Sequence, residues 1–213
     1  MEPDKTAAVE STKEWNSFSQ KYEDEVEHAT IQSSIILYSL TKAKEYSKIC
    51  EVGVGCGLAS RMFISNIMKA DSSYFTSDIS DEMNRLYYEN FEKCDSAFNP
   101  KVKLSWIKEK TDYVDTEKLI EEIGSEISRK IFVVQADNEK LPYLDSTFDL
   151  YLSSLSLMLV NNHKNQLAEA YRVLQPGGKA GFTVIGRPEN SNYLSFIPDL
   201  VKACGHEIPP SSK

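Results

Sequence analysis

The sequence has no excess of basic residues, and this limits the partners that it can bind. Of its 213 residues, 32 are Asp or Glu and 24 are Lys or Arg, so the formal net charge is −8. Nucleic-acid binders usually present a basic face, and on average this chain repels a polyanion. The composition therefore argues against a nucleic-acid partner, a local basic patch aside.

Long apolar runs are also missing. No segment approaches the roughly 18 apolar residues that a membrane-spanning helix needs. The first residues, MEPDKTAAVESTKEW, are polar and partly acidic, without the apolar centre of a secretion signal or the arginine-rich composition of a transit peptide. We expect a soluble, cytoplasmic protein with no membrane span.

Cysteine and histidine are scarce and show no ligand spacing. The four cysteines form no CxxC pair: Cys50, Cys56, Cys94 and Cys204. We expect free thiols in a reducing compartment, with Cys56 a small turn residue rather than a reactive one. The three histidines are far apart in sequence: His28, His163 and His206. The sequence predicts no metal site.

What the sequence does contain is a glycine-rich run, EVGVGCG, at 51–57. An apolar stretch precedes it, and a segment with apolar residues at helical spacing follows it. Glycines in such a strand–turn–helix unit allow a sharp turn and a close approach of a ligand to the backbone. The spacing is GxGxG rather than the GxGxxG of dinucleotide sites, which weakens a nicotinamide-dependent oxidoreductase as an alternative.

Strands and helices alternate along the chain, which predicts a parallel sheet with helices on both faces, within one domain. We expect helices over 12–44, 57–69, 81–92 and 163–174, and strands over 47–52, 74–78, 131–136, 148–154 and 179–185. Asp78 ends the second of these strands, next to the glycine turn. A carboxylate in that place can accept both hydroxyls of a ribose.

Five motifs occur in an order that resembles the class I S-adenosylmethionine-dependent methyltransferases. They are Glu51 with its glycines, SDISDEM at 77–83, QADNEKLPY at 135–143, STFDLYL at 146–152 and YRVLQPGGKAGFTV at 171–184. The resemblance covers about residues 47–186 and is closest to the type 11 branch, which includes ubiquinone and menaquinone biosynthesis enzymes. It implies a Rossmann-like, doubly wound, mostly parallel sheet, with S-adenosylmethionine as the cofactor.

The resemblance also implies roles for single residues. The methionine part of the cofactor would lie over Gly53 and Gly55, with Glu51 directed towards its ammonium group. Asp78 would hold the ribose, and Ile79 would pack on the adenine. The remaining contacts would be Asp137 to the adenine amino group, the Asn138 backbone N–H to the ring, and a carbonyl of Ser153 or Ser154 to the methionine end. Taken singly, Asp78 is also compatible with a helix cap and Asp137 with a turn residue.

The N-terminal region, 1–46, resembles the family's helical lid. Tyr22, in WNSFSQKYE at 15–23, either reaches the cofactor or packs in an ordinary helix stripe. Met158 and Leu159 follow the fourth strand, where many relatives carry histidines. They either form an apolar floor for the acceptor pocket or face the core.

The sequence departs from the family pattern in two places. Residues 94–130 form an insertion with helical spacing, interpreted as a surface elaboration in preference to a wall of the substrate pocket or a partner surface. Beyond the core at 47–186, the segment 187–213 lacks the reversed hairpin that usually closes the sheet. Either the sequence is truncated or the edge of the sheet is left open, and an open edge strand invites pairing.

We therefore predict methyl transfer, by direct displacement, to a small apolar or aromatic acceptor. The sequence identifies no catalytic base, acceptor atom or oligomeric state. Two alternatives remain: a non-catalytic methyltransferase-like binding or assembly protein, and a protein or RNA methyltransferase.

Overall fold

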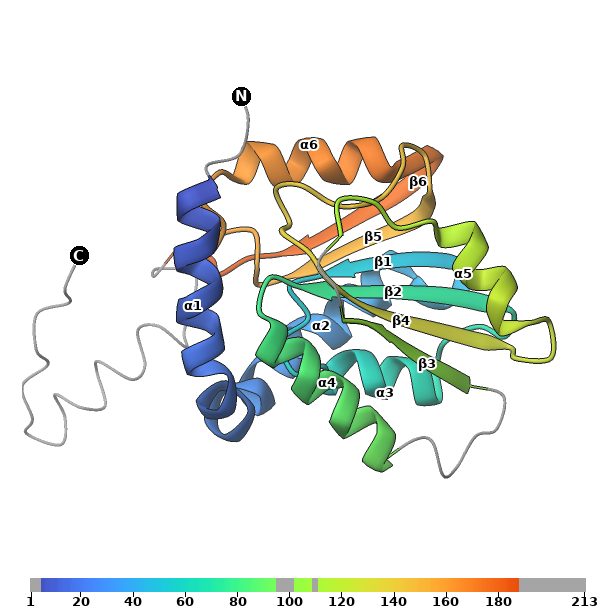
Figure 1. Ribbon diagram of the computed structural model, residues 1–213, viewed down its shortest axis with the longest axis horizontal. Coiled ribbons are helices and arrows are strands. Elements are labelled where there is room, and N and C mark those ends of the chain that lie inside the picture. The colour runs from blue at the N-terminus through green and yellow to red at the C-terminus, as the bar shows by residue number, and fades with distance from the viewer. Residues whose placement is uncertain (1–4, 95–101, 109–110, 188–213) are drawn as a thin grey trace, which may run out of the picture. The chain divides into compact units, whose positions relative to one another are not determined.

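The computed structural model describes residues 5–94, 102–108 and 111–187 (Figure 1). It divides into two compact units, Met1–Thr183 and Val184–Lys213. Every element named below belongs to the first unit. The sequence-based description of 1–213 as a single domain stays a prediction.

Six strands form one parallel sheet in the order β3-β4-β2-β1-β5-β6. Their bounds are β1 Lys48–Val52, β2 Ser72–Asp78, β3 Val102–Ile107, β4 Arg129–Gln135, β5 Phe148–Ser154 and β6 Leu174–Thr183. Because all strands run in one direction, their carboxyl ends meet at one edge of the sheet. Ligands of open α/β sheets bind outside that edge.

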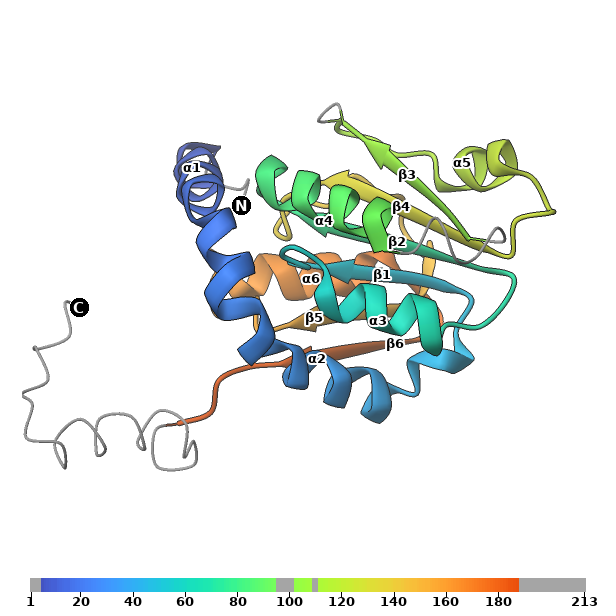
Figure 2. The same cartoon turned by 90° about the horizontal axis from the view of Figure 1, so that it is seen from below.

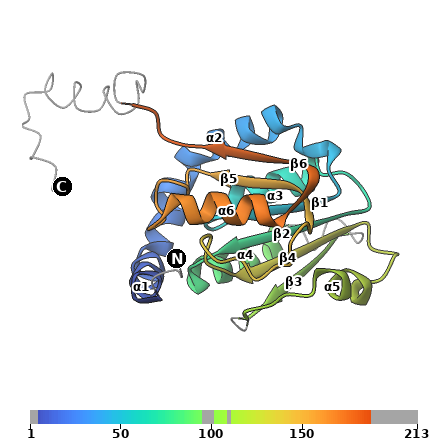
Figure 3. The ribbon, with the colours of Figure 1, turned by 90° about the horizontal axis from the view of Figure 1, so that it is seen from above.

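Helices cover both faces of the sheet, as Figures 2 and 3 show from below and from above. The helical elements are α1 Lys5–Lys21, the π-helical turn Tyr22–Val26, α2 Glu27–Thr41, the 3₁₀ turn Ala43–Glu45, α3 Leu58–Asn66, α4 Asp81–Cys94, α5 Thr116–Ile123 and α6 His163–Val173. α2, α3 and α4 lie on one face, and α5 and α6 on the other. This arrangement confirms the predicted doubly wound fold.

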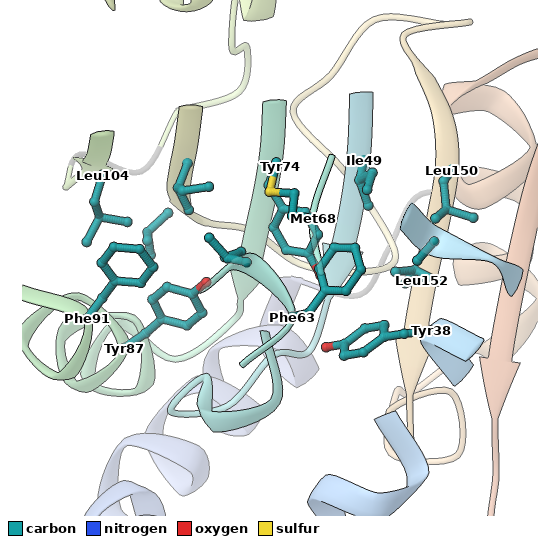
Figure 4. Packing of buried hydrophobic residues seen from close by; sticks show 14 of the residues in the cluster. Tyr38, Ile49, Phe63, Met68, Tyr74, Tyr87, Phe91, Leu104, Leu150 and Leu152 are labelled. Carbon is teal, nitrogen blue, oxygen red and sulfur yellow. The ribbon is translucent and has the colours of Figure 1, made fainter. Parts of the chain in front are cut away.

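The core follows from the alternation of side chains along the buried strands. Ile49 of β1 faces the cluster under α2 and α3, and its neighbour Cys50 faces the opposite cluster. In Figure 4 the rings of Phe63 and Tyr74 lie near Ile49, and Tyr38 lies on the other side of Phe63, with the ring centroids of Tyr38 and Phe63 4.8 Å apart. Each buried ring of this size stabilises the fold by about 1.5–3 kcal/mol. Truncation of Phe63 to Ala would remove the centre of this cluster.

Three helices begin at side chains that accept a hydrogen bond from the first turn. Ser80 accepts from the N–H of Met83 at 3.0 Å and so begins α4. Asp115 begins α5, and Asn162 begins α6. These caps satisfy backbone donors that have no partner within the helix.

The prediction that the insertion is a purely helical element is wrong. It contributes the edge strand β3, which pairs in parallel with β4, before the chain forms α5. β3 was missed because only Leu104 is buried in it, so its apolar signal is weak. α5 begins beside Lys48, whose Nζ donates to Thr116 Oγ1 at 2.9 Å. Since Lys48 opens β1, α5 starts at the amino edge of the sheet, which favours the interpretation of this helix as a surface elaboration.

The last strand, β6, begins at Leu174, five residues before the predicted start. An irregularity in its pairing with β5, between Phe148 and Leu150, accommodates the segment that contains Gly177. The expected absence of a reversed hairpin falls outside the described residues. Within the described ranges, no helix is both long and apolar enough to cross a membrane.

Candidate functional site

The glycine turn connects β1 to α3 at the carboxyl edge of the sheet. Gly53, Gly55 and Gly57 have φ angles of +64°, +59° and +81°, a region that other residues rarely adopt. The N–H of Gly53 donates to the carbonyl of Ser77 at 2.8 Å, which ties the turn to β2. The GxGxG spacing is therefore a backbone requirement of this turn.

Each glycine of the turn also lies close to another side chain. A Cβ on Gly53 would meet the Cβ of Ser156 at 2.5 Å, and one on Gly55 would meet the ring of Tyr22 at 2.8 Å. A Cβ on Gly57 would collide with the ring of Tyr87 at 2.0 Å. Glycine is thus required here for close packing as well as for φ.

Asp78, predicted to hold the ribose, lies directly beside the turn. Its Oδ2 accepts from the N–H of Gly55 at 3.1 Å, and its Oδ1 accepts from the N–H of Ser80 at 3.0 Å. The N–H of Ile79 also hydrogen-bonds to this carboxylate, so three of its four lone-pair sites are used and one is left for a further donor. Burial raises the pKa of Asp78, although the backbone hydrogen bonds oppose this shift. Ile79, next along the chain, is half-buried.

Glu51 lies in the core, on the face covered by α2 and α3. Its carboxylate accepts from the hydroxyls of Tyr38 at 2.8 Å and Tyr74 at 2.6 Å, and Ser60 also hydrogen-bonds to it. Burial raises its pKa, and these three hydrogen bonds oppose the shift. No pattern in the sequence indicates these three partners of Glu51. A role towards a ligand ammonium stays a prediction.

The loop after β4 brings Asp137 and Asn138 to the same edge. Asp137 Oδ1 accepts from the N–H of Glu139 at 2.9 Å, the local bond of a turn residue. Asn138 is 8% exposed, and its Oδ1 is buried without a hydrogen-bond partner in the described chain. An unpaired buried amide oxygen beside a glycine turn is an acceptor that a ligand donor can satisfy.

The end of β5 contributes a row of serines. Ser154 Oγ lies 3.0 Å from Thr183 Oγ1 on β6, and Ser153 Oγ lies 2.7 Å from Ser156 Oγ. Ser156, which packs on Gly53, was missed by the sequence reasoning. Its place just beyond a strand that ends at this edge was the only signal.

The N-terminal segment covers the carboxyl edge, with α1 lying across it in Figure 1. The amide of Asn16 donates to Asp81 Oδ1 at 2.7 Å and accepts from Ser80 Oγ at 2.7 Å. Tyr22 packs on Gly55, and its hydroxyl lies 3.1 Å from Thr30 Oγ1. Burial raises the pKa of Tyr22 to about 12, so the phenol stays neutral at physiological pH.

Glu27 is a further residue that sequence reasoning missed. Its Oε1 accepts from the N–H of Leu58 at 2.9 Å, and this places a carboxylate at the N-terminus of α3. The helix dipole favours an anion there. Burial nevertheless raises the pKa of Glu27. The N-terminal segment therefore holds the glycine turn from both Gly55 and Leu58.

A cavity of about 470 Å³ lies between α1 and the loop after β5. The residues that line it are Glu10, Ser11, Glu14, Trp15, Phe18, Leu159 and Asn161. Its volume falls in the usual range for small-molecule sites. Leu159 lines this cavity, whereas Met158 is 41% exposed and is not among the lining residues. For both residues a role in an acceptor pocket stays a prediction.

The structure brings most predicted ligand residues to one edge: the glycine turn, Asp78, Asn138 and Tyr22. Acceptors for ribose hydroxyls, a glycine cradle and an unpaired amide fit a nucleoside joined to an amino-acid group. Within the described ranges, no group of His, Cys, Asp or Glu could hold a metal ion. Cys50 and Cys56 are free thiols, and both are buried.

Comparisons with known proteins agree with this geometry. The family model described as "Methyltransferase domain" matches residues 50–182. A demethylmenaquinone methyltransferase of Lactobacillus johnsonii is 30% identical over 92 residues, covering 40% of this chain and 38% of that protein. Sterol 4-C-methyltransferase strm-1 of Caenorhabditis elegans is 42% identical over 97 residues, covering 39% of this chain and 28% of that protein. This chain therefore aligns with less than half the length of each relative.

Solved structures share the fold at lower identity. A protein of Methanococcus maripaludis, assigned as an S-adenosyl-L-methionine-dependent methyltransferase, superposes with a TM-score of 0.53 and 19% identity, covering 95% of this chain and 74% of that one. The [4+2]-cyclase SpnF superposes with a TM-score of 0.51 and 16% identity, covering 72% and 44% of the two chains. These likenesses show the fold alone, since one fold can serve more than one reaction.

Proposed function

This chain belongs to the class I S-adenosylmethionine-dependent methyltransferases, and from that premise we propose that it methylates a small apolar or aromatic acceptor. The observation that carries the proposal is the convergence at the sheet's carboxyl edge. Three positive-φ glycines, the carboxylate of Asp78 and the unpaired amide of Asn138 meet there. Together they provide a site for a nucleoside with an amino-acid group.

When bound, S-adenosylmethionine supplies an electrophilic methyl group on a sulfonium. Asp78 would accept from the ribose hydroxyls, Ile79 would pack on the adenine, and Asp137 with the Asn138 N–H would contact the ring. Gly53 and Gly55 would hold the methionine part, with Glu51 and a carbonyl of Ser154 directed towards its ammonium. These assignments follow the family resemblance, and the placement of Asp78 supports them best.

The chain contributes mainly by holding the two reactants in line and excluding water. Held by these residues, S-adenosylmethionine would supply its methyl group to the acceptor's nucleophilic atom and would leave as the thioether, and a proton on that atom would be released to solvent. α1, with Trp15 and Tyr22, is the element that shields this edge from water.

The cavity beside α1 supports the proposed acceptor class. Trp15, Phe18 and Leu159 give it aromatic and aliphatic walls. Glu10 and Glu14 lie in the same cavity and would repel an anionic acceptor such as a phosphate ester. The curated relatives include enzymes named for ubiquinone, menaquinone and sterol substrates, all of which are lipophilic. A neutral, lipophilic phenol or quinol-like molecule fits these walls.

A label-transfer screen tests the proposal. Cofactor carrying a radiolabelled methyl group is incubated with the chain and with lipophilic phenols, quinol-like compounds, tRNA or protein extract. We expect label in the lipophilic compounds, and no label when D78A replaces the native chain. Label only in tRNA or protein would overturn the small-molecule acceptor. If the chain binds cofactor but no label moves, a non-catalytic binding protein is favoured.

A further inference from the structure

The described residues that line the cavity beside α1 include two acidic side chains and no basic one. The acidic residues are Glu10 and Glu14, and both are exposed. Neither carboxylate forms an ion pair with a described side chain. In the described part of the chain, this wall of the cavity is therefore negative and lacks a counter-charge.

The helix brings these two carboxylates to the same side as two aromatic rings. Glu10, Glu14 and Phe18 recur at intervals of four residues along α1, and Trp15 follows Glu14 directly. Residues at this spacing lie on one face of a helix. Like charges four residues apart repel each other and destabilise the helix. A cation bound between Glu10 and Glu14 would remove this repulsion.

The rings supply a second attraction for a cation. The face of an aromatic ring carries the negative part of its quadrupole and attracts an ammonium group. Trp15 and Phe18 are half-buried and pack edge to face, with ring centroids 6.0 Å apart. Trp15 also packs against the buried cluster of Cys56, Met83 and Leu86, which holds its ring in place. Two held rings beside two carboxylates are a combination that suits an ammonium group.

The other wall of the cavity suits an apolar body. The loop after β5 contributes Leu159, which is 52% exposed, and the uncharged Asn161. A neutral phenol fits these walls but leaves both carboxylates of α1 without a counter-charge. A ligand with an apolar body and a positive group would satisfy both walls.

We propose that the acceptor favoured by this cavity carries an ammonium group on its apolar or aromatic body, an inference that rests on the function proposed above. The ammonium lies among the carboxylates of Glu10 and Glu14 and the rings of Trp15 and Phe18, and the body lies against Leu159. The ammonium is not the nucleophile, because a protonated or quaternary nitrogen has no lone pair. The nucleophile is another atom of the acceptor, such as a phenol oxygen.

Two phenols of the same shape test the effect of the charge. They are 3-hydroxyphenyltrimethylammonium and 3-tert-butylphenol, in which a carbon atom replaces the positive nitrogen. Calorimetric titration of the native chain should show the cationic phenol binding about 5- to 20-fold more tightly, although the neutral phenol gains more from leaving water. In E10Q/E14Q, which keeps the size of both side chains, this preference should fall to about 2-fold, with the affinity for 3-tert-butylphenol unchanged.

E121Q/E122Q is the matched control, because it removes two exposed glutamates of α5 that do not line the cavity. It changes the net charge by the same amount and should leave the preference unchanged. Equal affinities of the native chain for the two phenols, or no binding of either, would overturn the inference even if E10Q/E14Q does not fold. An undiminished preference in a folded E10Q/E14Q would overturn it as well.

A separate measurement distinguishes failure of the proposed function. Transfer of a radiolabelled methyl group from S-adenosylmethionine to acceptors is measured on the same native chain. If the cationic phenol binds more tightly but no acceptor becomes labelled, the proposed function is overturned, and the cation site is still supported.

Discussion

At the scale of single residues, the carboxylate of Asp78 meets two demands. It accepts hydrogen bonds from the N–H groups of Gly55, Ser80 and Ile79, and its remaining lone pair can accept from a ribose hydroxyl. D78A should therefore weaken S-adenosylhomocysteine binding about 10- to 100-fold, the range for hydrogen bonds to a charged acceptor. Isothermal titration calorimetry measures the loss.

A cofactor analogue without the ribose 2′-hydroxyl separates the role of Asp78 in the glycine turn from its role in binding the ribose. If Asp78 contacts that hydroxyl, the analogue binds more weakly than the natural ligand to the native chain, but equally well to D78A. A penalty of the same size in both proteins would mean that Asp78 acts only on the turn.

Glu51 allows a prediction about pH. Its folded-state pKa is raised above the ordinary value of 4.5, so the folded protein binds this proton more tightly than the unfolded chain. The stability that it contributes is fully present below pH 4.5 and is lost as the pH rises through the folded pKa. Glutamine has no such dependence. E51Q should therefore gain in melting temperature relative to the native chain on going from about pH 4 to pH 8.

Asp78 and Glu27 also have raised pKa values, but both residues are present in the native chain and in E51Q. Their contributions therefore cancel in the difference between the two melting temperatures. Parallel melting curves across the pH range would show that Glu51 does not carry a raised pKa. E51L is the companion variant. It removes the acceptor for two buried tyrosine hydroxyls and should be less stable than E51Q at every pH.

At the scale of elements, the glycine turn and the N-terminal segment are coupled through Gly55 and Tyr22. G55A places a Cβ 2.8 Å from the Tyr22 ring at a φ of +59°. We expect the free energy of unfolding to fall by at least about 1–2 kcal/mol because of the left-handed backbone, and to fall further because the Cβ is too close to the Tyr22 ring. Denaturant unfolding measures both.

Gly177 offers a matched control, because its φ is +85° and nothing lies within 4 Å of an added Cβ. G177A should lower the free energy of unfolding only by the contribution of the left-handed backbone. The difference between the two variants should shrink in G55A/Y22A, where the ring is absent. An undiminished difference would show that Tyr22 does not hold the turn.

Some helices and strands could be predicted from the sequence, and others could not. The buried strands and the glycine turn were predicted because apolar runs and punctuating glycines mark them, and β5 was predicted with its exact bounds. β3 was missed because an edge strand with one buried residue has little apolar signal. The interruption of the N-terminal helix by a π-helical turn at Tyr22–Val26 also has no simple sequence pattern.

Part of the candidate site could be predicted from the sequence, because local geometry determines which residues it needs. Glycines and strand-end carboxylates are fixed by local geometry, so Gly53, Gly55 and Asp78 could be named in advance. Partners that meet only in the folded chain could not. The contacts of Glu51 with its two tyrosines, and of Glu27 with the first N–H of α3, join residues distant in sequence.

At the scale of the whole molecule, family membership establishes the fold and the type of cofactor, while the acceptor depends on the cavity beside α1. Replacing Leu159, which lines that cavity, with Ser should raise the KM for a lipophilic acceptor several-fold and leave cofactor affinity unchanged. Met158→Ser, one residue away, serves as the comparison. Equal effects of the two changes would show that the acceptor does not bind in this cavity.

The central claim is that the carboxyl edge of this sheet binds S-adenosylmethionine, and calorimetric titration of the native chain tests it most directly. We predict saturable binding of S-adenosylmethionine and S-adenosylhomocysteine with a Kd in the low-micromolar range, roughly −7 to −8 kcal/mol. NADH should give no heat of binding. No heat and no thermal shift with either adenosyl ligand, from a chain shown to be folded, would contradict the account.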